Sequence, residues 1–306
     1  ALAAGAEGIG LARTERLFLG RELPPDEEEQ YRALEALAEA CAGRPLTLRL
    51  ADLGGGKTPP YLLPLLGASA LHRRGAALLA WSAALARPHL RAVARVVRNR
   101  RATVMVPMVA TRDEWLGVLA RWREATEAVG ARAALSLLVE APATALALDD
   151  YLAEADEVAL GTNDLAALLF GGDRERGEAV WRPLLQPVML RLLGGVIARA
   201  RRRGVRVTAC GDAAGELPEA LVLWGLGVDA LSVRAERLSS VGQALGALDH
   251  DLVRERTQDI LGLSDASEVH ERLDEWRREL DSQRKGGSRR ETIARTGSKY
   301  WLEDWE

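Results

Sequence analysis

Short apolar runs alternate along the chain with longer segments in which apolar residues recur every three or four positions. At residues 115–122 and 190–197 this spacing places the apolar side chains on one face of a helix. Apolar runs separated by such helices are typical of βα units around a buried parallel sheet. The pattern therefore predicts an α/β fold, either a barrel or a doubly wound sheet. Strands are expected at residues 8–12, 46–51, 102–107, 134–140, 157–161, 205–210 and 230–233.

Seven strands are one fewer than a closed (βα)8 barrel contains. The sequence opens in a helical pattern, Ala1-Leu-Ala-Ala-Gly-Ala6, with no strand before it. We expect a (βα)8 TIM barrel whose first strand lies upstream of residue 1, and we assign the barrel with its C-terminal helices to residues 1–281. Residues 282–306, which include the run Gln283-Arg-Lys-Gly-Gly-Ser-Arg-Arg290, are expected to form a charged, flexible tail.

Chemically capable side chains follow three of the predicted strands. Glu140 stands in the run Leu138-Val-Glu-Ala-Pro142, Asn163 and Asp164 follow the strand that ends at Gly161, and Cys210 ends the strand after it. Parallel α/β barrels keep their active sites at the carboxyl ends of their strands, so these groups are expected to converge. Two carboxylates and a thiol at such a place indicate an enzyme with metal-assisted chemistry and a cysteine acid or nucleophile.

Composition narrows the class of protein further. The 306 residues are 48% hydrophobic, which is enough for one large core or two smaller ones, and the net charge of −3 gives no bulk attraction to nucleic acid or anionic membranes. The sequence has no apolar run long enough for a membrane span and no recognisable signal peptide. Cys41 and Cys210 are far apart in the sequence, which fits a reducing compartment better than a disulfide framework. We expect a cytoplasmic protein without a membrane span.

Several motifs resemble those of one enzyme family. Gly8-Ile-Gly-Leu-Ala-Arg-Thr-Glu15 is similar to the GIGLLRTE segment of phosphoenolpyruvate-utilising enzymes, and Thr47-Leu-Arg-Leu-Ala-Asp-Leu-Gly-Gly-Gly-Lys57 resembles TIRTLDIGGDK of enzyme I, the phosphoenolpyruvate–protein phosphotransferase of the bacterial sugar phosphotransferase system. The turn before Lys57 favours enzyme I over pyruvate phosphate dikinase and phosphoenolpyruvate synthase. The resemblance covers about residues 1–275. Its further motifs, in the family's order, are Val106-Pro-Met108, Val139-Glu-Ala-Pro142, Gly161-Thr-Asn-Asp-Leu165 and Cys210-Gly-Asp-Ala-Ala-Gly215.

Glu140 and Asp164 are candidate metal ligands. They end consecutive strands, and neighbouring strands of a sheet lie about 4.8 Å apart, so the two carboxylates can share one ion. Mg2+ commonly takes one or two protein carboxylates and completes its octahedron with water and phosphate oxygens. From the sequence alone, Asp164 could instead cap the helix that follows it. The resemblance implies that both residues bind Mg2+.

Cationic side chains are the candidates for substrate binding. Phosphoenolpyruvate carries a carboxylate and a phosphate, which the planar fork of arginine pairs with bidentately. Arg13 ends a predicted strand and Arg49 lies within an apolar one, so neither is expected to be an ordinary solvated arginine. Other arginines, and the turn lysine, could equally be solvated surface charges. The resemblance implies that the substrate is bound by Arg13, Arg49, Lys57, Arg74, Asn163 and Arg174.

Cys210 is the candidate general acid. A thiol with an ordinary pKa of about 8.5 is mostly protonated at neutral pH and can donate its proton. When the phosphoryl group leaves phosphoenolpyruvate, the enolate must be protonated at its methylene carbon, and the resemblance implies that Cys210 supplies this proton. The alternative is a buried, inert cysteine, which is the commonest role of a free cysteine. That role is expected for Cys41.

The sequence also departs from the enzyme I pattern. Residues 68–77 replace the family's NPFLGWRAIR and retain one arginine, Arg74, and Asp212 stands where the family has glutamate. The phosphohistidine domain is not part of this sequence, and no histidine stands in a Thr-Ser-His type motif. Surface or helix positions are expected for the histidines, which are His72, His89, His250 and His270.

The resemblance therefore implies binding of Mg-phosphoenolpyruvate and phosphoryl transfer to a histidine on a domain outside this sequence, then to the phosphocarrier HPr. It also implies a homodimer and a role in sugar transport. Two alternatives stay open. One is a barrel fragment of pyruvate phosphate dikinase or phosphoenolpyruvate synthase. The other is a non-catalytic phosphoenolpyruvate-sensing protein, which the altered segment 68–77 favours and the retained Glu140, Asp164 and Cys210 oppose.

Overall fold

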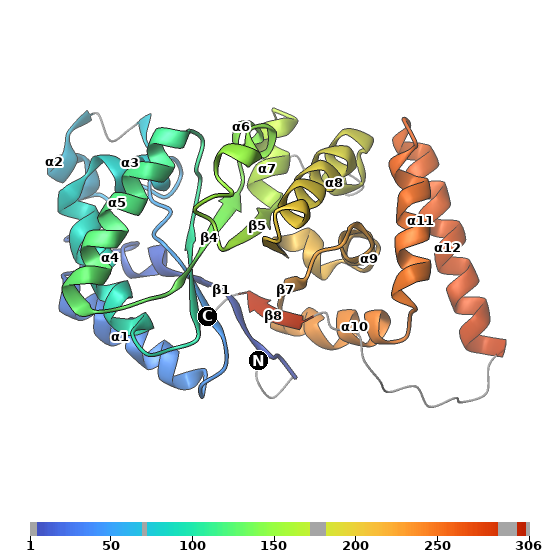
Figure 1. Cartoon of the computed structure of the whole chain (residues 1–306), viewed down its shortest axis with the longest axis horizontal. Helices are drawn as coiled ribbons and strands as arrows, with labels where there is room; N and C mark the ends of the chain where they lie inside the picture. Colours follow the sequence, from blue (N-terminus) through green and yellow to red (C-terminus); the bar gives the residue numbers. More distant parts are fainter. Residues whose placement is uncertain (1–4, 69–71, 172–181, 287–298, 304–306) are drawn as a thin grey trace.

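Eight parallel strands form a closed barrel in the computed structural model of the protein (Figure 1), which describes residues 5–68, 72–171, 182–286 and 299–303. Each strand pairs with the next along the chain, and β8 pairs with β1. The strands are β1 (Gly8–Arg13), β2 (Leu46–Arg49), β3 (Ala102–Val106), β4 (Ala134–Val139), β5 (Glu157–Gly161), β6 (Arg206–Cys210), β7 (Ala230–Arg234) and β8 (Lys299–Glu303).

The first seven of these strands are the seven that the sequence pattern predicts. Strands β2 and β5 are buried at every position, because helices cover them outside and side chains fill the barrel inside. Both strands nonetheless carry polar residues, Thr47 and Arg49 on β2 and Glu157 on β5. The predicted (βα)8 class is confirmed.

The eighth place in the barrel is filled differently from the expectation. Strand β8 lies between β7 and β1 and is parallel to both, with Trp301 in register with Ser232. The sequence pattern predicts a strand upstream of residue 1 for this place and a flexible tail from residue 282. Instead, helix α12 continues to Gly286, and residues 299–303 form the strand.

Helices surround the barrel, and several of them pack against one another (Figure 1). Helix α4 packs against both α1 and α5, and α11 packs against α9. Short 3₁₀ helices at Thr14–Leu17 and Asp212–Gly215 follow β1 and β6 directly. The helices are α1 (Glu27–Ala40), α2 (Leu62–Leu66), α3 (Ala76–Trp81), α4 (Ala83–Val97), α5 (Arg112–Val129), α6 (Pro142–Leu146), α7 (Thr162–Leu169), α8 (Pro187–Arg202), α9 (Leu217–Leu226), α10 (Ala235–Gly246), α11 (His250–Leu261) and α12 (Ala266–Gly286).

Local sequence determines where two of the helices begin. The Asp26 carboxylate accepts the backbone N–H of Glu29 at 2.8 Å, and the Glu29 side chain accepts the backbone N–H of Asp26 at 3.3 Å. This reciprocal capping box satisfies two N–H groups that the first turn of α1 would leave without partners. Thr111 and Glu114 form the same arrangement at the start of α5. Helix α5 then buries Trp115 against the core.

Side chains that point into the barrel lie in layers. Leu11, Met105, Leu138, Ala159 and Cys210 form an apolar cluster inside the barrel, separate from the main core between strands and helices. Because side chains alternate along a strand, the residue two positions toward the carboxyl end also points inward, above this cluster. Inward-pointing residues nearer the amino ends of the strands lie below the apolar cluster. Glu140, two positions after Leu138, belongs to the layer above.

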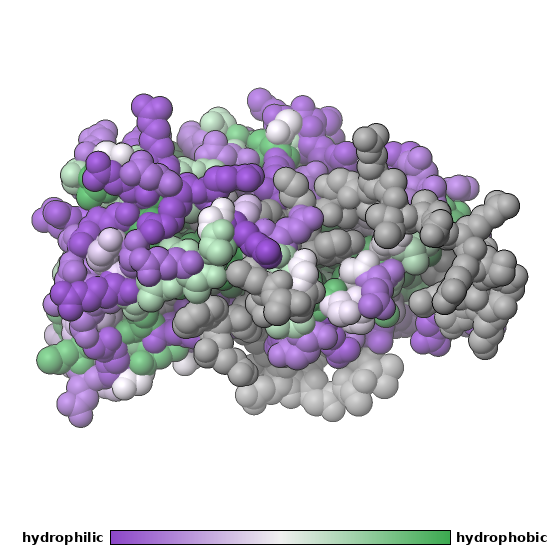
Figure 2. All heavy atoms as spheres, turned by 90° about the horizontal axis from the view of Figure 1, so that it is seen from below, coloured by the Kyte–Doolittle hydropathy of each residue, from purple (hydrophilic) through white to green (hydrophobic). Residues whose placement is uncertain are grey.

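The surface carries mixed polar and apolar side chains. Hydrophilic residues dominate the face shown in Figure 2, and apolar residues are scattered among them. Within the described ranges, no helix combines the length and the apolar character that crossing a membrane requires.

Candidate active site

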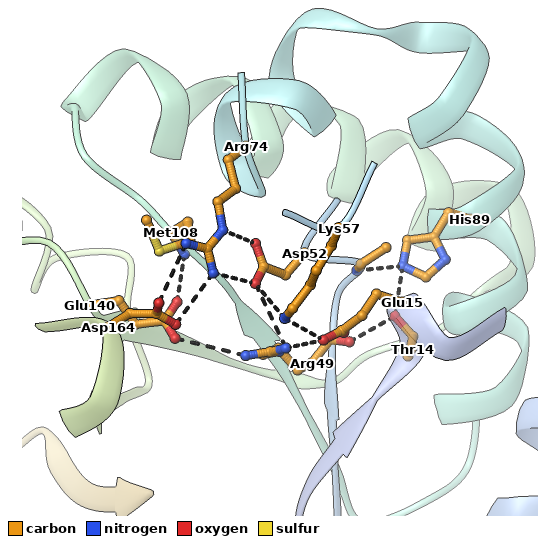
Figure 3. A network of polar contacts seen from close by, with 11 residues as sticks. Thr14, Glu15, Arg49, Asp52, Lys57, Arg74, His89, Met108, Glu140 and Asp164 are labelled. Atoms are coloured by element: carbon orange, nitrogen blue, oxygen red, sulfur yellow. Dashed lines mark hydrogen bonds and ion pairs between the residues drawn. The ribbon is translucent and has the colours of Figure 1, made fainter. Parts of the chain in front are cut away.

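Seven charged side chains converge at the carboxyl ends of the strands, above the apolar cluster (Figure 3). Three are cations and four are carboxylates, and each of them contacts at least one partner of opposite charge in the set. Because these residues come from distant parts of the sequence, only the closed barrel brings them together. We call this set the charged cluster; it consists of Glu15, Arg49, Asp52, Lys57, Arg74, Glu140 and Asp164.

Arg49 is the most deeply buried cation of the charged cluster. It ends β2 with 4% of its surface exposed and donates to Glu15 through Nη2. Its guanidinium also lies 3.8 Å from an Asp52 oxygen and 3.7 Å from a Glu140 oxygen. Burial alone would lower the pKa of Arg49, but the charges of Glu15, Glu140 and Asp52 more than offset burial and raise it. Arg49 therefore stays charged, as a buried cation with carboxylates around it must.

Lys57 completes a glycine-rich turn after β2. The turn is closed by two backbone hydrogen bonds of 3.1 Å between Gly54 and Lys57. Its short hairpin brings the ammonium group back over the site, where Nζ lies 3.0 Å from both Glu15 Oε1 and Asp52 Oδ2. The predicted turn lysine is thus part of the charged cluster and not a solvated surface residue.

Arg74 bridges two carboxylates. Its Nε and Nη2 each donate to the Asp52 carboxylate at 2.9 Å, and its Nη1 and Nη2 reach the Asp164 carboxylate at 3.4 and 3.3 Å. Asp52 is fully buried. Burial alone would raise the pKa of Asp52, but the hydrogen bonds from Arg74 and the charges of Arg49, Arg74 and Lys57 hold it below its ordinary value.

Glu140 and Asp164 lie beside each other at the ends of β4 and β5 (Figure 3). Glu140 accepts the backbone N–H of Met108 at 3.0 Å, and Met108 adopts a φ of 50°, which is uncommon for a residue with a side chain. Burial raises the pKa of Glu140 to about 7; the nearby charges of Asp164 and Asp52 act in the same direction, and Arg49 opposes them. A cation between the two carboxylates would stabilise the ionised form of Glu140.

Gly161 makes the approach of these two carboxylates possible. A Cβ at this position would lie 2.4 Å from Glu140 Cγ and 3.0 Å from Oε1, so a larger residue would displace the Glu140 side chain. The described residues contain no group of three or more His, Cys, Asp or Glu that could hold a metal ion. A pair of carboxylates suits Mg2+, because this ion keeps water and substrate oxygens in its remaining positions. The two residues thus fit the ion predicted from the sequence.

Cys210 lies inside the barrel, one layer below the charged cluster. Only 5% of its surface is exposed, its thiol lies 3.5 Å from the carbonyl oxygen of Leu160, and it packs with Leu11 and Met105. The sulfur is therefore buried, one layer below the charged cluster. Cys41 is buried as well, donates to the Leu37 carbonyl at 3.2 Å and lies in the main core, as predicted.

Asn163 pairs with Asp212, a residue outside the charged cluster. Its side-chain amide donates to Asp212 at 3.0 Å and its oxygen accepts the Asp212 backbone N–H at 3.1 Å. Gly211 permits this close contact: its φ is 104°, and a Cβ there would lie 2.4 Å from Thr162 Oγ1. Asp212 also pairs with Arg234 at 2.7 Å. Asn163 thus belongs to the rim of the site, at the ends of β5 and β6.

Two other predicted substrate residues are placed less directly. Arg13 ends β1, is half-buried and is in register with Arg49, so both arginines lie at the carboxyl edge of the barrel. Arg174 lies outside the described residues.

Glu15, Asp52 and His89 are residues of this site that the sequence analysis did not single out. Glu15 and Asp52 stand within the motifs that carry the resemblance, and that position was the available signal. His89 occupies a helix position on α4, as expected, but it is fully buried. Its Nε2 accepts the Ala51 N–H at 3.1 Å and its Nδ1 lies 2.8 Å from Gln30 Oε1. Burial lowers the pKa of His89 to about 3, so the ring is neutral.

Comparisons with known proteins identify the family of this chain. Residues 1–249 match the family described as "PEP-utilising enzyme, PEP-binding domain". Multiphosphoryl transfer protein 1 of Escherichia coli (strain K12) is 33% identical over 291 residues, which cover 92% of this chain and 35% of that protein. Phosphoenolpyruvate-protein phosphotransferase of Geobacillus stearothermophilus is 36% identical over 279 residues (88% and 48%), and that of Staphylococcus carnosus (strain TM300) is 34% identical over 282 residues (89% and 49%).

The chain spans between about a third and a half of the length of these relatives. The family match, in contrast, takes in most of the chain and every described strand except β8. It includes all seven members of the charged cluster, together with Cys210. The chain therefore belongs to the phosphoenolpyruvate-utilising enzymes and comprises their phosphoenolpyruvate-binding domain.

Proposed function

We propose that this barrel is the phosphoenolpyruvate site of a phosphoenolpyruvate–protein phosphotransferase. In this proposal the phosphoryl group passes from phosphoenolpyruvate to a histidine on another domain, and then to HPr. The observation that carries the proposal is the charged cluster at the carboxyl ends of the strands. Arg49 contacts Glu140 and Arg74 contacts Asp164, while Lys57 pairs with Glu15 and Asp52 beside them. The relatives named above are a multiphosphoryl transfer protein and phosphoenolpyruvate-protein phosphotransferases, which supports the transferase over a dikinase or a synthase.

The charged cluster can bind an anion because its cations already converge. Arg49 and Arg74 present planar forks that suit a carboxylate or a phosphate, and Lys57 adds a compact charge from the turn. In the described structure their partners are protein carboxylates. A substrate with a carboxylate and a phosphate would share these cations with Glu15 and Asp52, and Arg13, in register with Arg49, would add a further charge.

Glu140 and Asp164 would hold Mg2+. When bound, this ion neutralises charge on the phosphate and on the enolate oxygen. Two features of the chain favour a cation there: the raised pKa of Glu140 and the contact of Asp164 with Arg74. Arg74 would then turn from Asp164 toward the substrate and keep its paired bonds with Asp52, so that ion binding and arginine placement are coupled.

Cys210 would protonate the enolate. The thiol lies below the charged cluster, inside the barrel, so a substrate held by the cations with its methylene carbon directed into the barrel faces the sulfur. The S–H bond breaks and the proton goes to the methylene carbon. The products are pyruvate and the thiolate form of Cys210. Phosphoryl transfer itself relies on positioning and on charge neutralisation by the cations.

The partners of the proposed enzyme follow from the same proposal. The proposal includes a histidine acceptor, HPr as partner, a homodimer, a cytoplasmic location and a role in sugar transport. These are properties of the whole protein and not of the barrel by itself. A non-catalytic phosphoenolpyruvate sensor is the second candidate, because the segment around Arg74 is altered. The buried thiol next to a complete carboxylate pair opposes it, since a sensor needs no proton donor.

Deuterium exchange into pyruvate tests this function on the chain itself. Run backward, the proposed step removes a methyl proton from bound pyruvate through the Cys210 thiolate, and the thiol then returns a solvent deuteron. We expect Mg2+-dependent loss of the pyruvate methyl signal by proton NMR in D2O, abolished in Cys210→Ala and retained in Cys41→Ala, which removes the other buried thiol. Equal exchange by Cys210→Ala, or no exchange by a chain that binds pyruvate, would overturn the assigned role.

A further inference from the structure

A polar cavity occupies the lower half of the barrel interior. Its volume is about 250 Å³, and residues from the amino-terminal ends of β2, β3, β5, β6 and β7 line it, below the apolar cluster. Arg101, directly before β3, marks its open end at the floor of the barrel. A TIM barrel is normally filled by bulky apolar side chains at this level. Hydroxyl and charged groups stand here instead: Thr47, Thr103, Glu157, Arg206, Thr208 and Ser232.

The cavity extends from the barrel floor to the thiol. Arg206, Thr208 and Cys210 occupy alternate positions of β6, and all three line the cavity. At a rise of about 3.3 Å per residue, this face of β6 spans roughly 13 Å. The floor of the barrel and the proposed active-site thiol are thus connected through one polar space on the side opposite the substrate entrance.

Glu157 lies along this path. It is in register with Arg206, its carboxylate lies 3.4 Å from Arg206 Nη1, and it accepts a hydrogen bond from Thr208 Oγ1 at 3.3 Å. Only 6% of the residue is exposed. It is an acidic group that lines the cavity between the thiol and the floor, and phosphoenolpyruvate bound at the charged cluster would not contact it.

The cavity has the size and the polar partners that water requires. A water molecule takes about 30 Å³ in the liquid and is held by two to four polar groups, so several can fit here. Ser232 Oγ is buried and has no hydrogen-bond partner among the described residues, although it lines the cavity. Water in the cavity would satisfy this hydroxyl and link it to the neighbouring threonines and to Glu157.

We propose that this cavity delivers protons from the barrel floor to Cys210, with Glu157 as the relay acid. The inference rests on the proposed function, in which each turnover leaves Cys210 as a thiolate. The thiolate takes a proton from a cavity water, the waters below it pass one proton along in turn, the last of them takes a proton from the Glu157 carboxylic acid, and Glu157 regains a proton from solvent at the floor. In sum, one solvent proton reaches the pyruvate methyl group, and no other reactant is consumed.

The charges around Glu157 are compatible with a relay. Burial raises the pKa of Glu157, the charge of Asp229 before β7 acts in the same direction, and Arg206 opposes both. Arg101 also lines the cavity. A carboxyl group with a raised pKa is protonated more often near neutral pH and can donate, which a low-pKa carboxylate cannot do. The open floor lets the group regain its proton while substrate blocks the opposite end of the barrel.

The test uses Glu157→Gln, which keeps the shape and hydrogen-bonding ability of the side chain but cannot relay a proton. The matched control is Glu219→Gln: Glu219 is also buried, its pKa is also raised by burial, and it pairs with Arg182 at 3.4 Å on α9, away from the cavity. The readout is the rate of deuterium exchange into pyruvate with Mg2+. We expect Glu157→Gln to slow exchange about tenfold or more and to leave pyruvate affinity unchanged.

Chemical rescue separates a proton relay from structural support. Imidazole buffer is small enough to enter the cavity and can donate a proton, so it should restore exchange in Glu157→Gln in proportion to its concentration. It should not speed up Glu219→Gln or the unsubstituted chain. A structural role of Glu157 would instead lower melting temperature and affinity, with no rescue.

The outcomes separate this inference from the proposed function. Normal exchange by a folded Glu157→Gln, or slowed exchange that imidazole does not rescue, would overturn the relay while Cys210→Ala still abolished exchange. Exchange that persists in Cys210→Ala would overturn the role of the thiol in the proposed function, and the relay with it.

Discussion

Arg74 and Asp52 form a two-pronged ion pair, with Nε and Nη2 of the arginine each 2.9 Å from one oxygen of the carboxylate. The same guanidinium reaches Asp164, a proposed metal ligand. Arg74 is thus held in place by a buried aspartate while it touches the carboxylate that a metal ion would claim. This arrangement explains how an arginine from an altered segment can still serve the site.

Arg74→Lys should weaken phosphoenolpyruvate binding. Lysine keeps the charge but cannot keep two bonds to Asp52 while it reaches the substrate. Loss of one charge-assisted hydrogen bond, about 1.5–3 kcal/mol, corresponds to roughly a ten- to hundredfold rise in Kd, measured by calorimetry with Mg2+ present. Arg237→Lys, which alters an exposed pair with Glu216, should bind normally. Equal affinities of the two variants would remove Arg74 from the site.

Asp52 should stabilise the fold in a pH-dependent way. Its pKa is lowered in the folded state, so its contribution is complete above the ordinary aspartate pKa of about 3.9 and is lost as pH falls through the folded-state pKa. We expect Asp52→Asn to reduce the free energy of unfolding at pH 7 by about 3–5 kcal/mol, because it leaves buried cations under-compensated. The deficit should shrink below about pH 4.

Urea unfolding followed by circular dichroism from pH 3 to pH 8 measures this effect. The control is Asp274→Asn, which removes one partner of an exposed i,i+3 pair with Arg277 and should change the free energy of unfolding by no more than about 0.5 kcal/mol. An Asp52→Asn deficit that stays constant with pH would show that the carboxylate charge is not the source of the stability.

Gly161→Ala should disable the metal site without unfolding the barrel. The added Cβ would lie 2.4 Å from Glu140 Cγ, so the Glu140 side chain must turn away from Asp164. Mg2+ should then no longer strengthen phosphoenolpyruvate binding. Gly195→Ala on α8 is the matched control, since its Cβ meets nothing within 4 Å; it should bind normally and be slightly more stable. Normal Mg2+ dependence in Gly161→Ala would mean that the carboxylates need not be adjacent.

His89 should position the loop that carries Arg49 and Asp52. The neutral ring accepts the backbone N–H of Ala51, which lies between those two residues. His89→Leu leaves this N–H and the Gln30 amide oxygen without partners, so the free energy of unfolding should fall by about 2–5 kcal/mol and phosphoenolpyruvate affinity should fall as well. His89→Gln, which can donate and accept, should recover much of both. Equal binding by the leucine and glutamine variants would contradict the positioning role.

Most of the fold could be predicted from local sequence patterns. The seven predicted strands were recognisable because each leaves a short, largely apolar segment between helical patterns, which needs no long-range information to identify. Strand β8 was missed for a different reason: Lys299–Glu303 carries a charge at each end and follows a charged segment, and its place depends on two distant strands. His89 was missed because its contact is also long-range. The helical pattern of its segment does not predict which side chain contacts the loop after β2.

The site was predicted in part. Position at strand ends, together with the family resemblance, identified Arg49, Lys57, Arg74, Glu140 and Asp164, and the barrel brings all five together. The sequence could not predict which side chains contact one another. Side-chain directions set by the closed barrel decide these contacts. Asn163 pairs with Asp212, Glu15 and Asp52 pair with the cations, and Cys210 lines a polar cavity.

Calorimetric titration of phosphoenolpyruvate into this chain, with and without Mg2+, tests the central claim most directly. We expect binding that Mg2+ strengthens, and we expect that gain to be lost in Glu140→Gln and kept in Glu219→Gln. A chain that circular dichroism shows to be folded but that does not bind phosphoenolpyruvate, or that binds it equally well without Mg2+ and in Glu140→Gln, would contradict the account.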